Sequence, residues 1–109
     1  MSFDMNKLMQ QAAQMQEQVQ QMQEAAANEV AEASAGGGMV KVTANGAGRV
    51  LSISISPDAI DPSDPEGLSD LVLAGVNEAL RSAAAKVEAK AQQMQNEMLG
   101  GLGLPGLGG

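Results

Sequence analysis

The chain has 109 residues, with six Lys and Arg against thirteen Asp and Glu, a formal net charge of -7, no Cys, no His and one aromatic residue, Phe3. Because Cys and His are absent, disulfides, thiolate chemistry, the commonest general base and the commonest transition-metal ligand are excluded, and we expect neither an enzyme nor a cofactor. The acidic balance by itself argues against nucleic acid as a partner.

The first predicted element is a helix from Asp4 to about Ala27, with Asp4 as its N-cap and Asn28 as its stop. It would be about 36 Å long. Apolar residues repeat on one face at heptad spacing, which is typical of a coiled-coil seam. One seam position holds Met5, Ala12, Val19 and Ala26, and the other holds Leu8, Met15 and Met22.

The segment from Glu29 to Ala35 alternates Val30, Glu32 and Ser34 with three alanines. Alanine favours a helix and the alternation favours a strand, and we expect a short strand. Gly36-Gly37-Gly38 then turns the chain. It is not predicted to cradle a phosphate, because a strand follows it and a phosphate-binding glycine loop opens a helix.

The next segment, from Gly36 to Pro57, reads as a β-hairpin. Val40, Val42 and Ala44 alternate with polar residues in its first strand, as Leu51, Ile53 and Ile55 do in its second. Asn45-Gly46-Ala47-Gly48 suits a tight turn. For both apolar sets to share one face, paired residue numbers must have an odd sum. A two- or four-residue loop provides this, whereas a three-residue loop requires a bulge.

A second helix is predicted from Pro65 to about Met98, with Asp64 as its N-cap. Its first half has an apolar stripe wide enough to cover a sheet, formed by Leu68, Leu71, Val72, Val76, Ala79 and Leu80. Its second half narrows to a seam of Ala84, Val87, Ala91, Met94 and Met98. We therefore expect one domain over residues 1–99 and a Gly- and Leu-rich flexible tail over residues 100–109.

A single small core without aromatic residues is marginal by itself, and the helical seams add apolar surface. Both observations predict a homodimer. Its predicted interface consists of Leu8, Met15, Val19, Met22, Val40, Val42, Leu80 and Val87. With no targeting segment and no stretch suited to a bilayer, we expect a cytoplasmic protein without a membrane partner or a small-molecule substrate.

Several short segments occur in a distinctive order and spacing along nearly the whole chain. They are Met5-Asn6-Lys7-Leu8-Met9, Gly37-Gly38-Met39-Val40-Lys41-Val42-Thr43, Asn45-Gly46, Ile55-Ser56-Pro57, Leu71-Val72 and Gly101-Leu102-Gly103-Leu104-Pro105-Gly106. Together they resemble the YbaB/EbfC family of nucleoid-associated proteins. The resemblance implies an α+β fold with the order α-β-β-β-α, a tweezers-like homodimer, a place in the nucleoid and duplex DNA binding attributed to the helices.

Four basic residues lie on the two predicted helices and are the candidates for phosphate contacts: Lys7, Arg81, Lys86 and Lys90. Such contacts are independent of base sequence and add up in a dimer. The alternative is that these residues pair with neighbouring carboxylates and only keep the protein soluble. DNA binding also requires the acidic residues between Asp58 and Asp70 to lie far from the DNA-facing surface.

The same acidic segment could suggest a metal site, but prolines interrupt it and helix capping explains Asp64 and Glu66, so none is predicted. The Met-rich seams are expected to be packing surfaces rather than an adaptable binding groove. Two rival functions remain open. One is a prefoldin-like holdase chaperone, and the other is a dimeric adaptor for recombination or replication proteins that never touches DNA.

Overall fold

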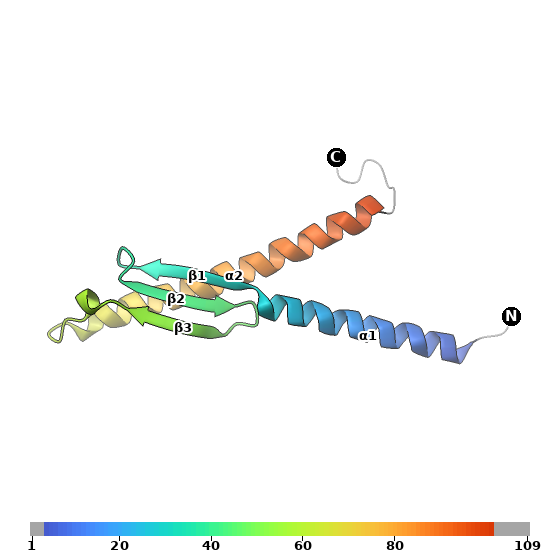
Figure 1. Cartoon of the computed structure of the whole chain (residues 1–109), viewed down its shortest axis with the longest axis horizontal. Coiled ribbons are helices and arrows are strands. Elements are labelled where there is room, and N and C mark those ends of the chain that lie inside the picture. The colour runs from blue at the N-terminus through green and yellow to red at the C-terminus, as the bar shows by residue number, and fades with distance from the viewer. Residues whose placement is uncertain (1–3, 102–109) are drawn as a thin grey trace.

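The computed structural model describes residues 4–101 as two helices and one three-stranded sheet (Figure 1). The elements are α1 (Met5–Asn28), β1 (Val30–Ala35), β2 (Val40–Asn45), β3 (Val50–Ile55), the short 3₁₀ helix η1 (Pro57–Ala59) and α2 (Pro65–Gly101). The strands are antiparallel in the order β1-β2-β3. The predicted α-β-β-β-α order is confirmed. Within residues 4–101, neither helix has a stretch apolar enough to cross a bilayer.

Helix α1 is capped by Asp4 as predicted. The Asp4 carboxylate accepts hydrogen bonds from the backbone N–H groups of Asn6 at 3.1 Å and Lys7 at 3.3 Å. The helix ends at Asn28, where Glu29 becomes extended. No residue of α1 is buried. Its side chains therefore have little packing within their own chain to hold them.

Strand β1 confirms the prediction for the ambiguous alanine-rich segment. Ala31 and Ala33 are buried, while the residues between and beside them are exposed, which is the two-residue period of a strand. Tertiary packing has overridden the helix preference of alanine. Gly36, Gly37 and Gly38 all have positive φ, at 64°, 68° and 95°, and so form the turn to β2 without the strain that other residues would suffer.

The β2–β3 hairpin has the predicted register. Val40 pairs with Ile55 and Val42 pairs with Ile53. Thr43 pairs with Ser52, but the pair after it joins Ala44 to Val50, so Leu51 is an extra residue and forms a β-bulge. The bulge accompanies a loop of three residues, 46–48. A 2.9 Å hydrogen bond from the Asn45 N–H to the Arg49 carbonyl closes this loop. Among the predicted options, the structure has the three-residue loop with its required bulge.

The core lies between the sheet and the first half of α2. Val40, Val42 and Ala44 of β2 have no exposed surface and pack with Ala79 of α2. Gly75 allows the close approach, since a Cβ at this position would lie 3.0 Å from a Val42 methyl group. Helix α2 crosses β1 and β2 but barely touches β3. The apolar face of β3 is consequently left uncovered.

Beyond the sheet, α1 and the second half of α2 extend as two diverging helices (Figure 1). We call α1 the first arm and residues 87–101 of α2 the second arm. They give the described chain its long, thin shape of 78 × 36 × 15 Å. Helix α2 continues past its predicted end near Met98 to Gly101. The rest of the predicted tail, from Leu102, lies outside the described residues.

Candidate nucleic-acid interface

The two arms meet at a joint where four elements come together. We define the joint by Glu29, Val30, Gly46, Lys86 and Lys90. The Lys86 ammonium group donates a 2.8 Å hydrogen bond to the Val30 carbonyl, and the Lys90 ammonium group forms a 2.5 Å ion pair with the Glu29 carboxylate. The Gly46 N–H donates a 2.9 Å hydrogen bond to the Glu29 carbonyl. The base of the first arm is therefore fastened to α2 and to the hairpin loop.

The electrostatics of the joint centre on Glu29. The hydrogen bond from Lys90, its positive charge and the nearby charge of Lys86 all lower the pKa of the Glu29 carboxyl group below its ordinary value of 4.5. The Glu29 side chain is 21% exposed and that of Lys90 is 57% exposed. The Glu29 side chain is thus largely shielded, whereas more than half of the Lys90 side chain is open to solvent.

Gly46 fits the joint because it has no side chain. A Cβ at this position would overlap the Ala26 carbonyl oxygen of the first arm and the Val87 side chain of the second arm. The φ angle of Gly46 is not positive, so the requirement for glycine here comes from space alone. The hairpin loop therefore packs tightly between the bases of both arms.

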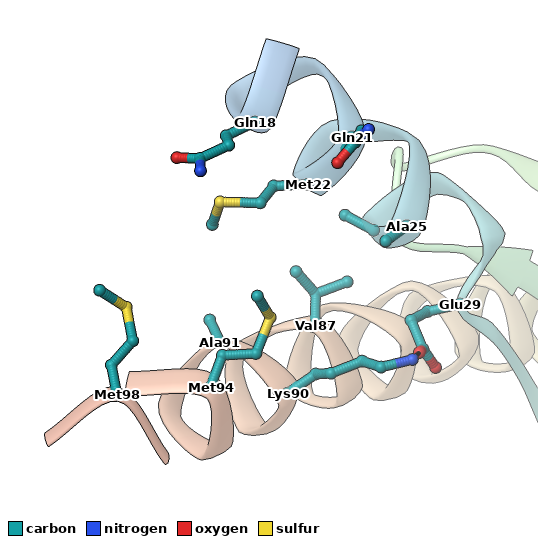
Figure 2. Close-up of a pocket in the computed structure, with 11 residues that line it drawn as sticks. Gln18, Gln21, Met22, Ala25, Glu29, Val87, Lys90, Ala91, Met94 and Met98 are labelled. Atoms are coloured by element: carbon teal, nitrogen blue, oxygen red, sulfur yellow. Dashed lines mark hydrogen bonds and ion pairs between the residues drawn. The ribbon is translucent and has the colours of Figure 1, made fainter. Parts of the chain in front are cut away.

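Above the joint, the arms enclose an open groove of about 670 Å³. Met22 and Ala25 line it from the first arm, and Val87, Met94 and Met98 line it from the second arm. Figure 2 shows the side chains of Met22 and Met94 pointing toward one another across the gap. The same view shows Lys90 reaching along the base of the groove to Glu29. The groove is apolar, with one ion pair at its closed end.

The four predicted phosphate-binding residues do not form one patch within a protomer. Lys7 lies near the tip of the first arm, Lys86 and Lys90 lie at the joint, and Arg81 lies on α2 over the sheet. Arg81 donates two hydrogen bonds to Glu78, at 3.1 and 2.5 Å, which raise the pKa of Arg81 and lower the pKa of Glu78. Within residues 4–101, Lys7 is the one of the four whose side chain has no hydrogen bond or ion pair.

The acidic segment that argued against DNA lies away from the arms. Asp58, Asp61 and Asp64 belong to the connection between β3 and α2, and Glu66 and Asp70 to the first turns of α2. In Figure 1 this connection lies at the opposite end of the molecule from the free ends of both arms. The acidic connection is therefore separated from the free ends of both arms within the protomer.

The predicted dimer-interface residues fall into two groups. Leu8, Met15, Val19 and Met22 are all exposed on the first arm, each by at least half, and Val87 lines the groove. Val40 and Val42, by contrast, are completely covered by α2 within their own chain, and Leu80 packs against the same core. The two valines belong to the protomer core, because no part of their side chains can reach a second copy.

The structure reveals an apolar surface that sequence reasoning did not place outside. Leu51, Ile53 and Ile55 of β3 are 52%, 45% and 37% exposed, and Leu73 of α2 is 60% exposed. The alternation in β3 showed that these three strand residues share a face. That alternation did not show how far α2 would extend across the sheet. The ion pair between Glu29 and Lys90 was also missed, since sixty-one positions separate its partners.

Comparisons with known proteins agree with this architecture. The family model described as the YbaB/EbfC DNA-binding family matches residues 1–98. A nucleoid-associated protein of Thermoanaerobacter pseudethanolicus is 49% identical over 105 residues, which cover 96% of this chain and 91% of the relative. One from Nocardia farcinica is 47% identical over 112 residues, covering 98% and 94%. The crystal structure of the uncharacterized protein HP0035 from Helicobacter pylori has the same fold, with a TM-score of 0.65 at 21% identity over 86% of this chain and 99% of that chain.

Proposed function

The chain belongs to the YbaB/EbfC DNA-binding family, and from this premise we propose that it is a non-enzymatic nucleoid-associated protein that binds duplex DNA as a homodimer. The observation that carries the proposal is the match to the DNA-binding family over residues 1–98. The names of the relatives, which describe nucleoid-associated proteins, support a place in the nucleoid.

The proposed homodimer is supported by the apolar surface that one protomer leaves exposed. Leu8, Met15, Val19 and Met22 form a stripe on the first arm, and Leu51, Ile53 and Ile55 form a second surface on β3. A protomer of this size gains much from burying such surface, and large exposed apolar patches mark interaction sites. We assign both surfaces to contacts with a second copy, together with Val87 of α2 and the part of the Leu80 side chain that the protomer core leaves uncovered.

The proposed DNA contacts are made by Lys7, Arg81, Lys86 and Lys90, each present twice in the dimer. Arg81 and Lys90 form ion pairs, but their side chains are 74% and 57% exposed. Exposed ion pairs are weak, so a phosphate can replace the carboxylate partner. Contacts of this kind bind the phosphate backbone and carry no direct information on base sequence.

The test is binding of the purified protein to a random-sequence duplex across a salt series. We expect a Kd of about 10⁻⁴ M or tighter at physiological salt, weakening linearly on logarithmic axes with a slope of about -0.9 per phosphate contacted. Absence of binding even at low salt would contradict the proposal. The adaptor function, in which protein partners are bound without DNA, would then explain the exposed surfaces better.

One observation favours a second candidate function. The groove between the arms is open and lined by Met22, Met94 and Met98, and methionine side chains adapt to varied apolar partners. A prefoldin-like holdase would use such a groove to hold unfolded chains. Light scattering from a heat-unfolded client protein tests this: suppression of aggregation by the wild type but not by a Met22→Gln/Met94→Gln variant would support the holdase.

A further inference from the structure

We propose that a line of glutamines on the first arm binds the backbone of duplex DNA through uncharged amide groups. We call it the glutamine line, and its members are Gln11, Gln14, Gln18 and Gln21, with Lys7 at the outer end. The inference deepens the proposed function and rests on it, because it names further residues that contact the DNA.

The first arm carries little charge for an exposed helix. Among its 24 residues are eight Gln but only three charged residues, Lys7, Glu17 and Glu24. No two of these three are three or four positions apart, so α1 lacks the ion pairs along its own surface that support many solvent-exposed helices. The hydrogen-bonding capacity of this arm therefore resides mainly in its amides.

The glutamine line lies beside the apolar stripe of the first arm and is distinct from it. Each member directly precedes a residue of the predicted seam, as Gln14 precedes Met15 and Gln18 precedes Val19. One position corresponds to a rotation of about 100° around the helix axis. All members are exposed, and none is a carboxylate. A second copy can therefore cover the stripe and leave the glutamine line open to another partner.

Basic residues lie at both ends of the glutamine line. Lys7 begins it near the tip of the first arm, and Gln21 at its inner end lines the groove together with Lys90. Figure 2 shows Gln21 on the first arm, across the groove from Lys90. The corresponding line on the other side of the stripe, which follows the seam residues, includes Gln16 and Gln20 but no basic residue. The glutamine line is therefore the side that suits a phosphate backbone.

The chemistry of the amide fits an acidic chain that binds DNA. The whole sequence has six basic residues, and Arg81, Lys86 and Lys90 already donate to acceptors in their own protomer. A Gln amide offers two donors without a charge, and Gln is among the residues that contact phosphates in protein–DNA complexes. The line from Lys7 to Gln21 is about 21 Å long, which matches about six steps of 3.4 Å along a DNA strand.

The test uses two double substitutions that are symmetric about the apolar stripe. Gln14→Ala/Gln18→Ala removes amides from the glutamine line, and its matched control is Gln16→Ala/Gln20→Ala on the other side. Alanine is a better helix former than glutamine, and both variants keep the net charge. Circular dichroism and sedimentation velocity should therefore show both proteins folded and in the oligomeric state of the wild type.

Binding is measured on a random-sequence duplex across a salt series. We expect Gln14→Ala/Gln18→Ala to bind about ten-fold more weakly than the wild type at every salt concentration. The slope against salt should be unchanged, because neutral donors release few counterions. The control should bind like the wild type. The loss should also be equal on A·T-rich and G·C-rich duplexes, since backbone contacts do not distinguish bases. A loss confined to A·T-rich DNA would overturn the assignment to phosphate.

A second pair of variants tests the same positions by repulsion. Gln14→Glu/Gln18→Glu keeps the shape of the side chains but replaces donors by negative charges, and should weaken binding far more than Gln16→Glu/Gln20→Glu. Wild-type affinity in Gln14→Ala/Gln18→Ala, or equal losses on both sides of the stripe, would refute this inference while the proposed function stands. A wild type that does not bind DNA even at low salt would refute the proposed function itself.

Discussion

Val42 and Ile53 are directly paired across β2 and β3, yet Val42 is fully buried and Ile53 is 45% exposed. The difference arises because α2 covers the face of β2 and stops short of β3. Two residues with the same place in the hairpin pattern therefore belong to different surfaces, one inside the protomer and one available to a second copy.

Substitution by aspartate should separate these two surfaces. Val42→Asp places a carboxylate in the core, at a cost comparable to a typical total stability of about 5 to 15 kcal/mol, so we expect the protein not to fold. Ile53→Asp should keep the protomer folded and weaken the homodimer. Circular dichroism measures folding and sedimentation velocity measures the oligomeric state. A folded Ile53→Asp variant that remains fully dimeric would remove the β3 surface from the proposed interface.

The close packing around Gly46 predicts that one added methyl group there would strongly lower the free energy of unfolding. Gly46→Ala would force the hairpin loop away from Ala26 and Val87, and we expect a loss of about 1 to 3 kcal/mol, as for overpacking of a core. Urea denaturation measures this loss. Ala47→Ser changes the neighbouring exposed loop position and serves as the control, with an expected change within about 0.5 kcal/mol. Equal stability of both variants would show that the loop can move at no cost.

Charge reversal tests which basic residues contact DNA. The double variant Lys7→Glu/Arg81→Glu should remove four phosphate contacts per dimer and lower the salt slope by about 3 to 4. Its matched control is Lys41→Glu/Arg49→Glu, which changes the net charge equally but at the sheet and its hairpin loop. Binding to a random duplex should weaken far more in the first variant. Equal losses would mean that the total charge, and not the helical positions, governs binding.

Protonation of Glu29 should loosen the joint at low pH. Its pKa is lowered in the folded protein, so the ion pair with Lys90 is fully present above the ordinary value of 4.5 and is lost as the pH falls through the lowered pKa. A carboxyl-carbon NMR titration should give a midpoint below 4.5 for the wild type and a higher one for Lys90→Met. Arg81→Met is the control. It should raise the midpoint of Glu78 and leave that of Glu29 unchanged.

Local chemistry in the sequence was enough to predict the elements of this fold. Asp4 and Asp64 cap the two helices, alternating apolar residues define the hairpin strands, and three consecutive glycines form the turn before β2. A bulge was also predicted as the condition for a three-residue loop, and the structure places it at Leu51. Each of these features depends on residues close together in the chain.

Features that depend on distant residues were not predictable in the same way. No local pattern states that α2 covers Val42 but leaves Ile53 exposed, because the extent of coverage follows from how the helix crosses the sheet. Nor does any pattern pair Lys90 with Glu29. Lysines on a helix that also bears carboxylates suggest pairing within that helix. Arg81 and Glu78 do so, whereas Lys90 reaches the base of the other arm.

The absence of any buried residue in α1 also bears on how the protein unfolds. A helix without tertiary packing has only marginal stability by itself, whereas the sheet and the first half of α2 share a core. Backbone amides of α1 should therefore exchange with solvent through local opening, well before those of β2. Once a second copy no longer covers the first arm, heat or urea would then melt each protomer in two stages. Far-ultraviolet dichroism, which is weighted toward the long helices, would report an earlier transition than any probe placed in the sheet.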